Sequence, residues 1–87
     1  MLAFVLPLAG ALALYPHFAD ALFKLGVAYQ TVAVDYDRAV FYYKRAMKEA
    51  PAAAIIYSNF GAVYETLGKQ EFASYYYNKA VEGESFV

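Results

Sequence analysis

The chain has 87 residues, with seven Lys and Arg against eight Asp and Glu and an apolar share of 62%. This length allows one small domain at most, and the balanced charge gives no indication of nucleic acid or of an acidic ligand as a partner. Because cysteine is absent, disulfides, thiolate metal ligands and a cysteine nucleophile are excluded, and the compartment stays undetermined.

The opening stretch, from Met1 to Ala19, contains no Asp, Glu, Lys or Arg. A bilayer span needs about 20 apolar residues, and Pro7 and Gly10 interrupt this stretch early, which argues against a transmembrane helix. A signal peptide would have an apolar centre of this length, but the basic start that it also needs is missing.

A first helix is predicted from about His17 to Thr31, with one apolar face made by Leu22, Leu25, Gly26 and Tyr29. A second helix follows and begins near Asp37, whose carboxylate suits the positive end of a helix. Pro51 closes this unit and favours the start of the next helix.

A third helix is predicted from about Ala53 to Leu67, and its matching face is made by Tyr57, Phe60, Gly61 and Tyr64. Gly68 supplies the helix stop. The last helix then begins near Glu71 and contains three consecutive tyrosines, Tyr75 to Tyr77.

The two units are copies of one pattern. Ala39, Tyr43 and Ala46 recur 34 residues later as Ala73, Tyr77 and Ala80, whereas Gly26 and Tyr29 recur 35 residues later as Gly61 and Tyr64. The extra residue of the first copy therefore lies in the connection between Tyr29 and Ala39. Each mid-helix glycine costs about 1 kcal/mol against alanine, which indicates close approach of a neighbouring helix.

This pattern resembles the tetratricopeptide repeat (TPR), a 34-residue helix–turn–helix unit. Positions that match are Leu22, Leu25, Gly26, Tyr29, Ala39, Tyr43, Ala46 and Pro51 in the first unit, and Tyr57, Phe60, Gly61, Tyr64, Ala73, Tyr77 and Ala80 in the second. Leu22 and Tyr57 stand where the family has tryptophan, and Ser85 stands where it has proline. The resemblance implies an all-α, antiparallel helix-pair solenoid.

The same frame extends backwards, because Ala11 and Pro16 precede Ala46 and Pro51 by 35 residues. Residues 1–15 are therefore predicted to form the second helix of a partial repeat, although Phe4 stands where the pattern has a small residue. The expected organisation is that apolar helix, one repeat over 16–51 and one over 52–87, giving five helices and about two and a half repeats. A signal segment remains the alternative for residues 1–15.

Neither end of this predicted stack has a polar cap, which repeat proteins need for solubility. The apolar first helix and the tyrosines of the last helix favour burial by another chain. A possible docking surface therefore contains Phe4, Leu8, Tyr75 and Tyr76. For any single tyrosine, a half-exposed aromatic on a small domain is the simpler interpretation.

A TPR superhelix offers a concave groove lined by the first helix of each unit, which implies binding of a peptide or a partner helix. The residues expected there are Asp20, Phe23, Lys24, Val27, Gln30, Thr31, Ile55, Ser58, Asn59, Ala62, Glu65 and Thr66. Asn59 can pair with a ligand backbone through both its donor and its acceptor, or it is simply a solvated helix residue. TPR domains that bind the C-terminal carboxylate of a chaperone need several Lys, Arg and Asn along this face. Here only Lys24 and Asn59 are present, so the resemblance does not favour that subtype.

No catalytic arrangement was found in the sequence. His17 is the only histidine and lies at a helix start, and neither a metal-ligand cluster nor a phosphate-binding loop is present. We therefore expect no enzyme activity, no metal, no cofactor and no nucleic acid. Three hypotheses remain. The first is a module that binds a protein or peptide in its groove, and the second is a self-associating piece that forms a homo-oligomer or docks into a larger complex. The third, ranked last, has the N-terminus as a signal or membrane anchor.

Overall fold

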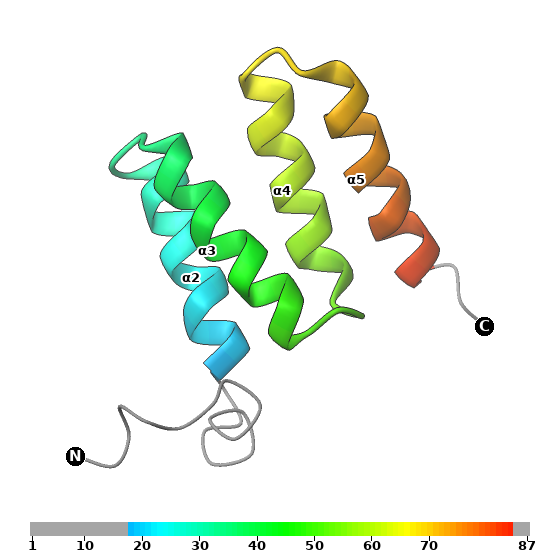
Figure 1. The fold of residues 1–87 in the computed structure, drawn as a ribbon, viewed down its shortest axis with the longest axis horizontal. Helices are drawn as coiled ribbons and strands as arrows, with labels where there is room; N and C mark the ends of the chain where they lie inside the picture. Colours follow the sequence, from blue (N-terminus) through cyan, green and yellow to red (C-terminus); the bar gives the residue numbers. More distant parts are fainter. Residues whose placement is uncertain (1–17, 85–87) are drawn as a thin grey trace.

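The structure of the chain is a computed structural model that describes residues 18–84, and every regular element in this range is a helix (Figure 1). These are α2 (Phe18–Thr31), α3 (Tyr36–Glu49), α4 (Ala54–Thr66) and α5 (Gln70–Glu84). α2 packs against α3, α4 packs against α5, and α3 joins the two pairs by packing on α4. The result is two stacked helix–turn–helix units.

The prediction of five helices is wrong, because residues 18–84 form four. The fifth was assigned to residues 1–15, which lie outside the described residues. That assignment depended on two spacings of 35 residues, at Ala11 and Pro16. The segment also departs from the repeat pattern, because Phe4 stands where the pattern has a small residue that lets neighbouring helices approach closely.

The extra residue of the first unit lies in its turn, as predicted. Residues 32–35 connect α2 to α3, whereas only residues 67–69 connect α4 to α5. Val34 has a φ of 53°, a left-handed conformation that costs a residue with a Cβ about 1–2 kcal/mol. In the shorter turn this conformation falls on Gly68, with a φ of 79°, where glycine adopts it without that cost.

Asp35 ends the longer turn and caps α3. Its side chain accepts a hydrogen bond from the backbone nitrogen of Arg38 at 3.1 Å, and it also pairs with the Arg38 guanidinium at 3.1 Å. The cap satisfies one of the backbone donors that the first turn of a helix leaves without a partner.

Small residues let the helices of each unit approach closely. A Cβ added to Gly26 would lie 2.6 Å from the ring of Tyr43, and one added to Gly61 would lie 2.9 Å from the ring of Tyr77. Ala39 and Ala73 are also buried, and the Ala73 carbonyl oxygen would lie 3.2 Å from a Cβ added to Gly61. The sequence prediction of close approach at both glycines is confirmed.

One hydrophobic core joins the two units. It contains Leu22 of α2, Ala39, Tyr43 and Ala46 of α3, and Ile56, Phe60 and Val63 of α4. The rings of Tyr43 and Phe60 meet edge to face across the boundary between the units, with centroids 6.2 Å apart. The second unit therefore buries its apolar face against the first.

Candidate partner-binding groove

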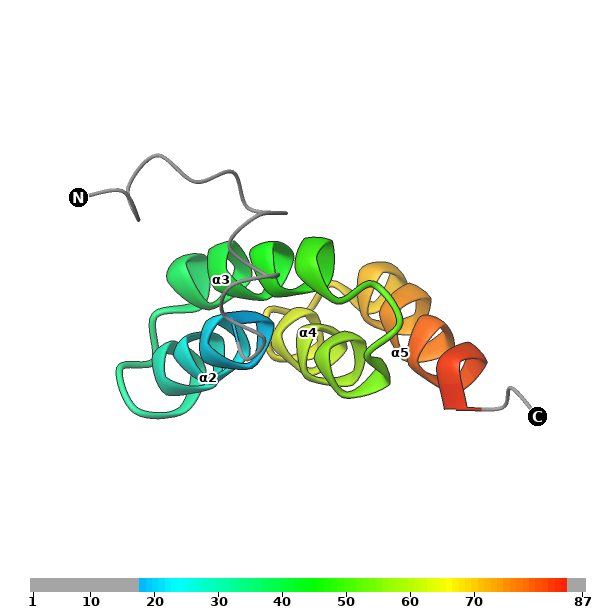
Figure 2. The ribbon, with the colours of Figure 1, turned by 90° about the horizontal axis from the view of Figure 1, so that it is seen from below.

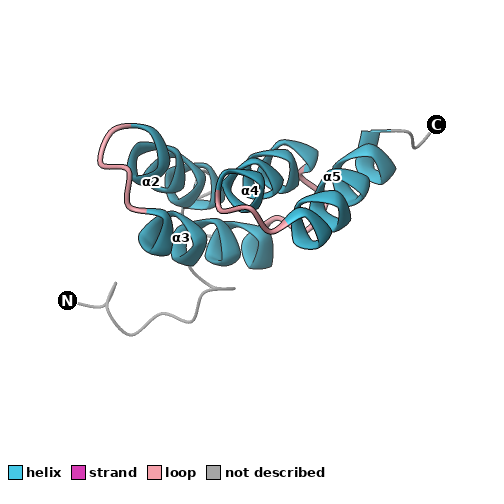
Figure 3. Ribbon diagram, turned by 90° about the horizontal axis from the view of Figure 1, so that it is seen from above, coloured by secondary structure: helices cyan, strands magenta, loops and turns pink. Residues whose placement is uncertain are grey.

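The predicted groove residues all lie on α2 and α4, the first helices of the two units. These helices lie in one layer with α3 in another, as the views from below and from above show (Figures 2 and 3). α2 packs mainly against α3 of its own unit and touches α4 only to a small extent.

Three predicted groove residues, Asp20, Phe23 and Ile55, line one cavity of about 180 Å³ between the starts of α2 and α4. The carboxylate of Asp20 provides the only charge among the lining side chains. Ile55 is 59% exposed, so an apolar group entering from solvent would meet it directly. The structure thus brings residues from both units into one apolar site.

Sequence reasoning missed the other walls of this cavity, which are Ala19, Ala50, Ala53 and Ile56. Three are alanines, and two of these, Ala50 before Pro51 and Ala53 after it, lie in the turn between α3 and α4. Small side chains on both sides of a turn proline leave room there, and this is the signal that could have indicated the cavity.

Phe23 and Val27 are half-buried and pack against the core. The Phe23 ring lies 5.9 Å from the ring of Tyr43, centroid to centroid. These two predicted groove residues therefore contribute to the stability of the fold.

Gln30 and Asn59 meet at the hydroxyl of Tyr43, a side chain with no exposed surface. The hydroxyl donates to Gln30 Oε1 at 2.6 Å and accepts from Asn59 Nδ2 at 3.5 Å, so it links α2, α3 and α4. Burial raises the pKa of Tyr43, and the hydrogen bond from Asn59 lowers it in part. Within the described residues, Gln30 Nε2 and Asn59 Oδ1 make no side-chain hydrogen bond.

The remaining groove positions of α2 are exposed. Asp20 and Lys24 form an ion pair at 3.0 Å, one helical turn apart. Thr31 donates its hydroxyl to the Val27 carbonyl at 2.8 Å. This bond occupies the hydroxyl donor within its own helix.

The α4 positions differ in exposure. Ser58 and Ala62 are half-buried, and Thr66 donates to the Ala62 carbonyl at 3.0 Å. Glu65 is exposed and accepts a hydrogen bond from the Tyr77 hydroxyl at 2.6 Å. This hydrogen bond, followed by burial and the nearby negative charge, raises the pKa of Tyr77.

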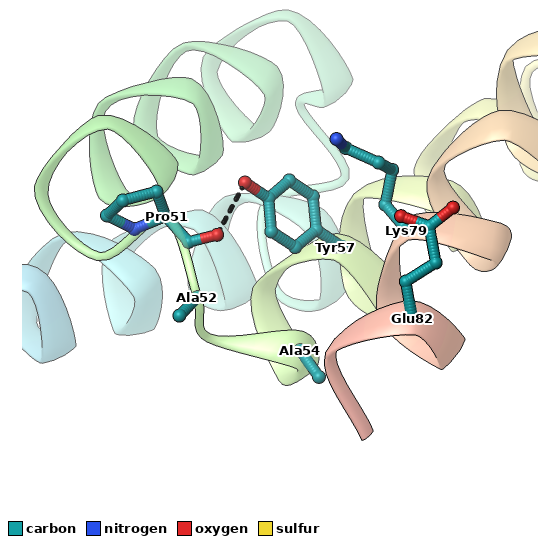
Figure 4. A pocket seen from close by; sticks show the side chains of 6 residues that line it. All are labelled: Pro51, Ala52, Ala54, Tyr57, Lys79 and Glu82. Atoms are coloured by element: carbon teal, nitrogen blue, oxygen red, sulfur yellow. Dashed lines mark hydrogen bonds between the residues drawn. The ribbon is translucent and has the colours of Figure 1, made fainter. Parts of the chain in front are cut away.

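A second hollow, of about 240 Å³, lies between the start of α4 and the end of α5. Tyr57 points into it and donates its hydroxyl to the Pro51 carbonyl at 2.9 Å, while Lys79 and Glu82 stand on the α5 side (Figure 4). Because the lining carries one positive and one negative side chain, it provides no net charge that would favour an ionic ligand.

Of the predicted docking residues, Tyr75 and Tyr76 lie side by side on α5, with their rings edge to face and the ring centroids 4.9 Å apart. Tyr75 is 54% exposed, whereas Tyr76 is half-buried and packs against Phe60, with ring centroids 4.5 Å apart. Tyr76 also stacks on Tyr64 at 5.9 Å. Phe4 and Leu8 lie outside the described residues.

The described part of the chain has no group of three or more His, Cys, Asp or Glu that could hold a metal ion. No helix among residues 18–84 is long and apolar enough to cross a membrane.

Comparison with solved structures identifies the architecture. The chain superposes on the crystal structure of MamA, a TPR-like protein, with a TM-score of 0.75 and 33% sequence identity over 90% of this chain. The fold is TPR-like. The matched region covers 45% of the MamA chain, so this chain spans less than half of that protein. No family model and no curated protein matches the sequence.

Proposed function

We propose that this chain is a non-catalytic protein-interaction module that holds an extended peptide or a partner helix against the face formed by α2 and α4. The observation that carries the proposal is the apolar cavity shared by Phe23 and Ile55, which come from different units. Its volume of about 180 Å³ suits one apolar side chain of a partner, and such anchoring is typical of peptide grooves.

The side-chain amides of Gln30 on α2 and Asn59 on α4 support the same proposal. Gln30 Nε2 and Asn59 Oδ1 lie outside the hydrogen bonds to Tyr43, so one side chain offers a donor and the other an acceptor. A peptide backbone presents the complementary groups. Because Tyr43 fixes both amides, little side-chain entropy would be lost when they bind a ligand.

The test uses a short peptide selected for binding to this chain from a random library. Ile55→Asp places a charge in the cavity at a largely exposed position, so it leaves the core intact. We expect the substitution to weaken binding of the peptide at least about tenfold. Phe23 and Asn59 are unsuitable for this purpose, because both contact Tyr43 and their loss would also destabilise the fold.

The matched control is Tyr75→Asp, since Tyr75 is 54% exposed against 59% for Ile55 and lies on α5. The control should bind the peptide as the unchanged chain does. Equal binding to the Ile55→Asp variant, measured by isothermal titration, would show that the groove is not the binding site.

Self-association is the second candidate function. It is favoured by the contrast between Leu25, which is 42% exposed, and Phe60, its counterpart in the second unit, which has no exposed surface. Val81, near the end of α5, is 58% exposed. Each end of the stack thus presents apolar side chains to solvent, and mass measured against concentration tests whether copies associate through them.

A further inference from the structure

The boundary between the two units is formed by one face of α3 and one face of α4. On α3, Tyr43 lies in the core and Val40 and Met47 pack against it, and we assign these three positions to the α3 face of the boundary. On α4 the opposing face is made by Ile56, Phe60 and Val63, all buried. The edge-to-face contact of Tyr43 with Phe60 lies at this boundary.

Both faces recur, unpaired, at the two ends of the described chain. The positions on α5 that correspond to the α3 face are Ser74, Tyr77 and Val81, of which Ser74 and Val81 are exposed. The positions on α2 that correspond to the α4 face are Ala21, Leu25 and Ala28, all exposed. We call these the α5 end face and the α2 end face.

The hydrogen-bonded groups of this interface also recur at the two end faces, but there charged side chains replace the two neutral amides. Inside the chain, Tyr43 bonds to Gln30 of its own unit and to Asn59 of the next. At the α5 end face, Tyr77 bonds to Glu65, the counterpart of Gln30, at 2.6 Å. The position equivalent to Asn59 in the first unit is Lys24.

A second copy stacked in the same register would therefore bring Lys24 to the Tyr77–Glu65 pair. Within residues 18–84 Glu65 makes no salt bridge. Lys24 pairs with Asp20, and the side chains of both residues are exposed to solvent. Replacing an exposed pair costs little, and opposite charges at the two end faces fix the orientation of the copies.

From this complementarity we infer that the α5 end face of one copy docks onto the α2 end face of a second copy, so that the chain assembles head to tail. The inference rests on the second candidate function and specifies its geometry. Such a contact uses two different surfaces, so it leaves one free face of each kind after every addition and continues as an open stack.

The test blocks one face at a time. Leu25→Asp blocks the α2 end face and Val81→Asp blocks the α5 end face, and both side chains are exposed enough to leave the fold intact. Each variant alone should stay monomeric by light scattering at concentrations where the unchanged chain forms larger species. An equimolar mixture should form a 1:1 dimer and nothing larger, because only one competent interface remains.

The charges are tested separately. Lys24→Glu and Glu65→Lys should each weaken association about fivefold, as expected for a partly exposed ion pair. The double variant should recover most of it, because the reversed charges attract again. Phe41→Asp on α3 is the control and should associate as the unchanged chain does, because Phe41 is 53% exposed and belongs to neither end face.

Two outcomes overturn the inference in different ways. If the unchanged chain associates but the mixed variants give no capped dimer, the head-to-tail geometry is wrong and self-association stands. If the unchanged chain is monomeric at every concentration, self-association falls as well. Neither result affects the proposal that α2 and α4 bind a peptide.

Discussion

Replacing Gly26 with alanine tests the close packing on which the fold depends. In an open helix this change stabilises by about 1 kcal/mol, because alanine loses less backbone entropy than glycine. Here the new Cβ would lie 2.6 Å from two ring carbons of Tyr43 and 3.1 Å from a third. The ring has no exposed surface, and its hydroxyl is held by Gln30 at 2.6 Å, so it cannot move aside freely.

Overpacking of this kind costs about 1–3 kcal/mol, which exceeds the gain in helix propensity. We expect Gly26→Ala to lower the free energy of unfolding by about 1 kcal/mol, which for a domain of this size lowers the melting temperature by roughly 4–8 °C. Thermal and urea unfolding followed by circular dichroism measure both quantities.

A companion variant separates the clash from other effects. Tyr43→Leu destabilises by itself, but it removes the ring that Gly26→Ala meets, so the glycine substitution should cost less in that background. A stability gain for Gly26→Ala in the unchanged chain would refute the reasoning, because it would show that α2 and α3 do not approach as closely as described.

Three further predictions concern the turn and the tyrosines. Val34→Gly should raise the free energy of unfolding by about 1 kcal/mol in urea titrations, because it relieves a φ of 53°; a loss of stability would mean that Val34 is not strained. The pKa of Tyr43 is raised in the folded chain, so the unfolded state loses its proton first as the pH rises above about 10. Between the unfolded and the folded pKa, Tyr43 should therefore lower the free energy of unfolding by up to about 1.4 kcal/mol per pH unit. A Tyr43→Phe variant with the same slope in alkaline urea titrations would contradict this. Glu65→Ala should lower the pKa of Tyr77 towards its usual value, measured by NMR of the ring carbon; an unchanged pKa would exclude the hydrogen bond to Glu65 as the cause of its shift.

Spacing in the sequence was enough to predict the helix pairs. Gly26 and Gly61 are costly inside helices, so two of them in matching positions imply a packing reason, and the structure shows tyrosine rings at both. The turn stop at Gly68 was predictable for the same reason, since a left-handed φ favours glycine. The count of five helices was wrong, since the described residues form four; its fifth helix was assigned from spacing alone to residues 1–15, which lie outside the described range.

The candidate groove was predictable only in outline. A helical register shows which side of α4 Asn59 occupies, but not that its amide reaches across to the hydroxyl of Tyr43. The adjacent tyrosines Tyr75 and Tyr76 have different surroundings for a similar reason: one residue turns a helix by about 100°, and only Tyr76 then meets Phe60 and Tyr64.

The hydroxyl of Tyr43 links the proposed groove to the boundary between the units. Gln30 and Asn59 come from different units and are held by one buried side chain. A peptide that bonds to both amides would bridge the units a second time and oppose their separation. Ligand binding should therefore raise the unfolding free energy of the whole stack by linkage, and a groove substitution at Asn59 should weaken both the binding and the contact between units.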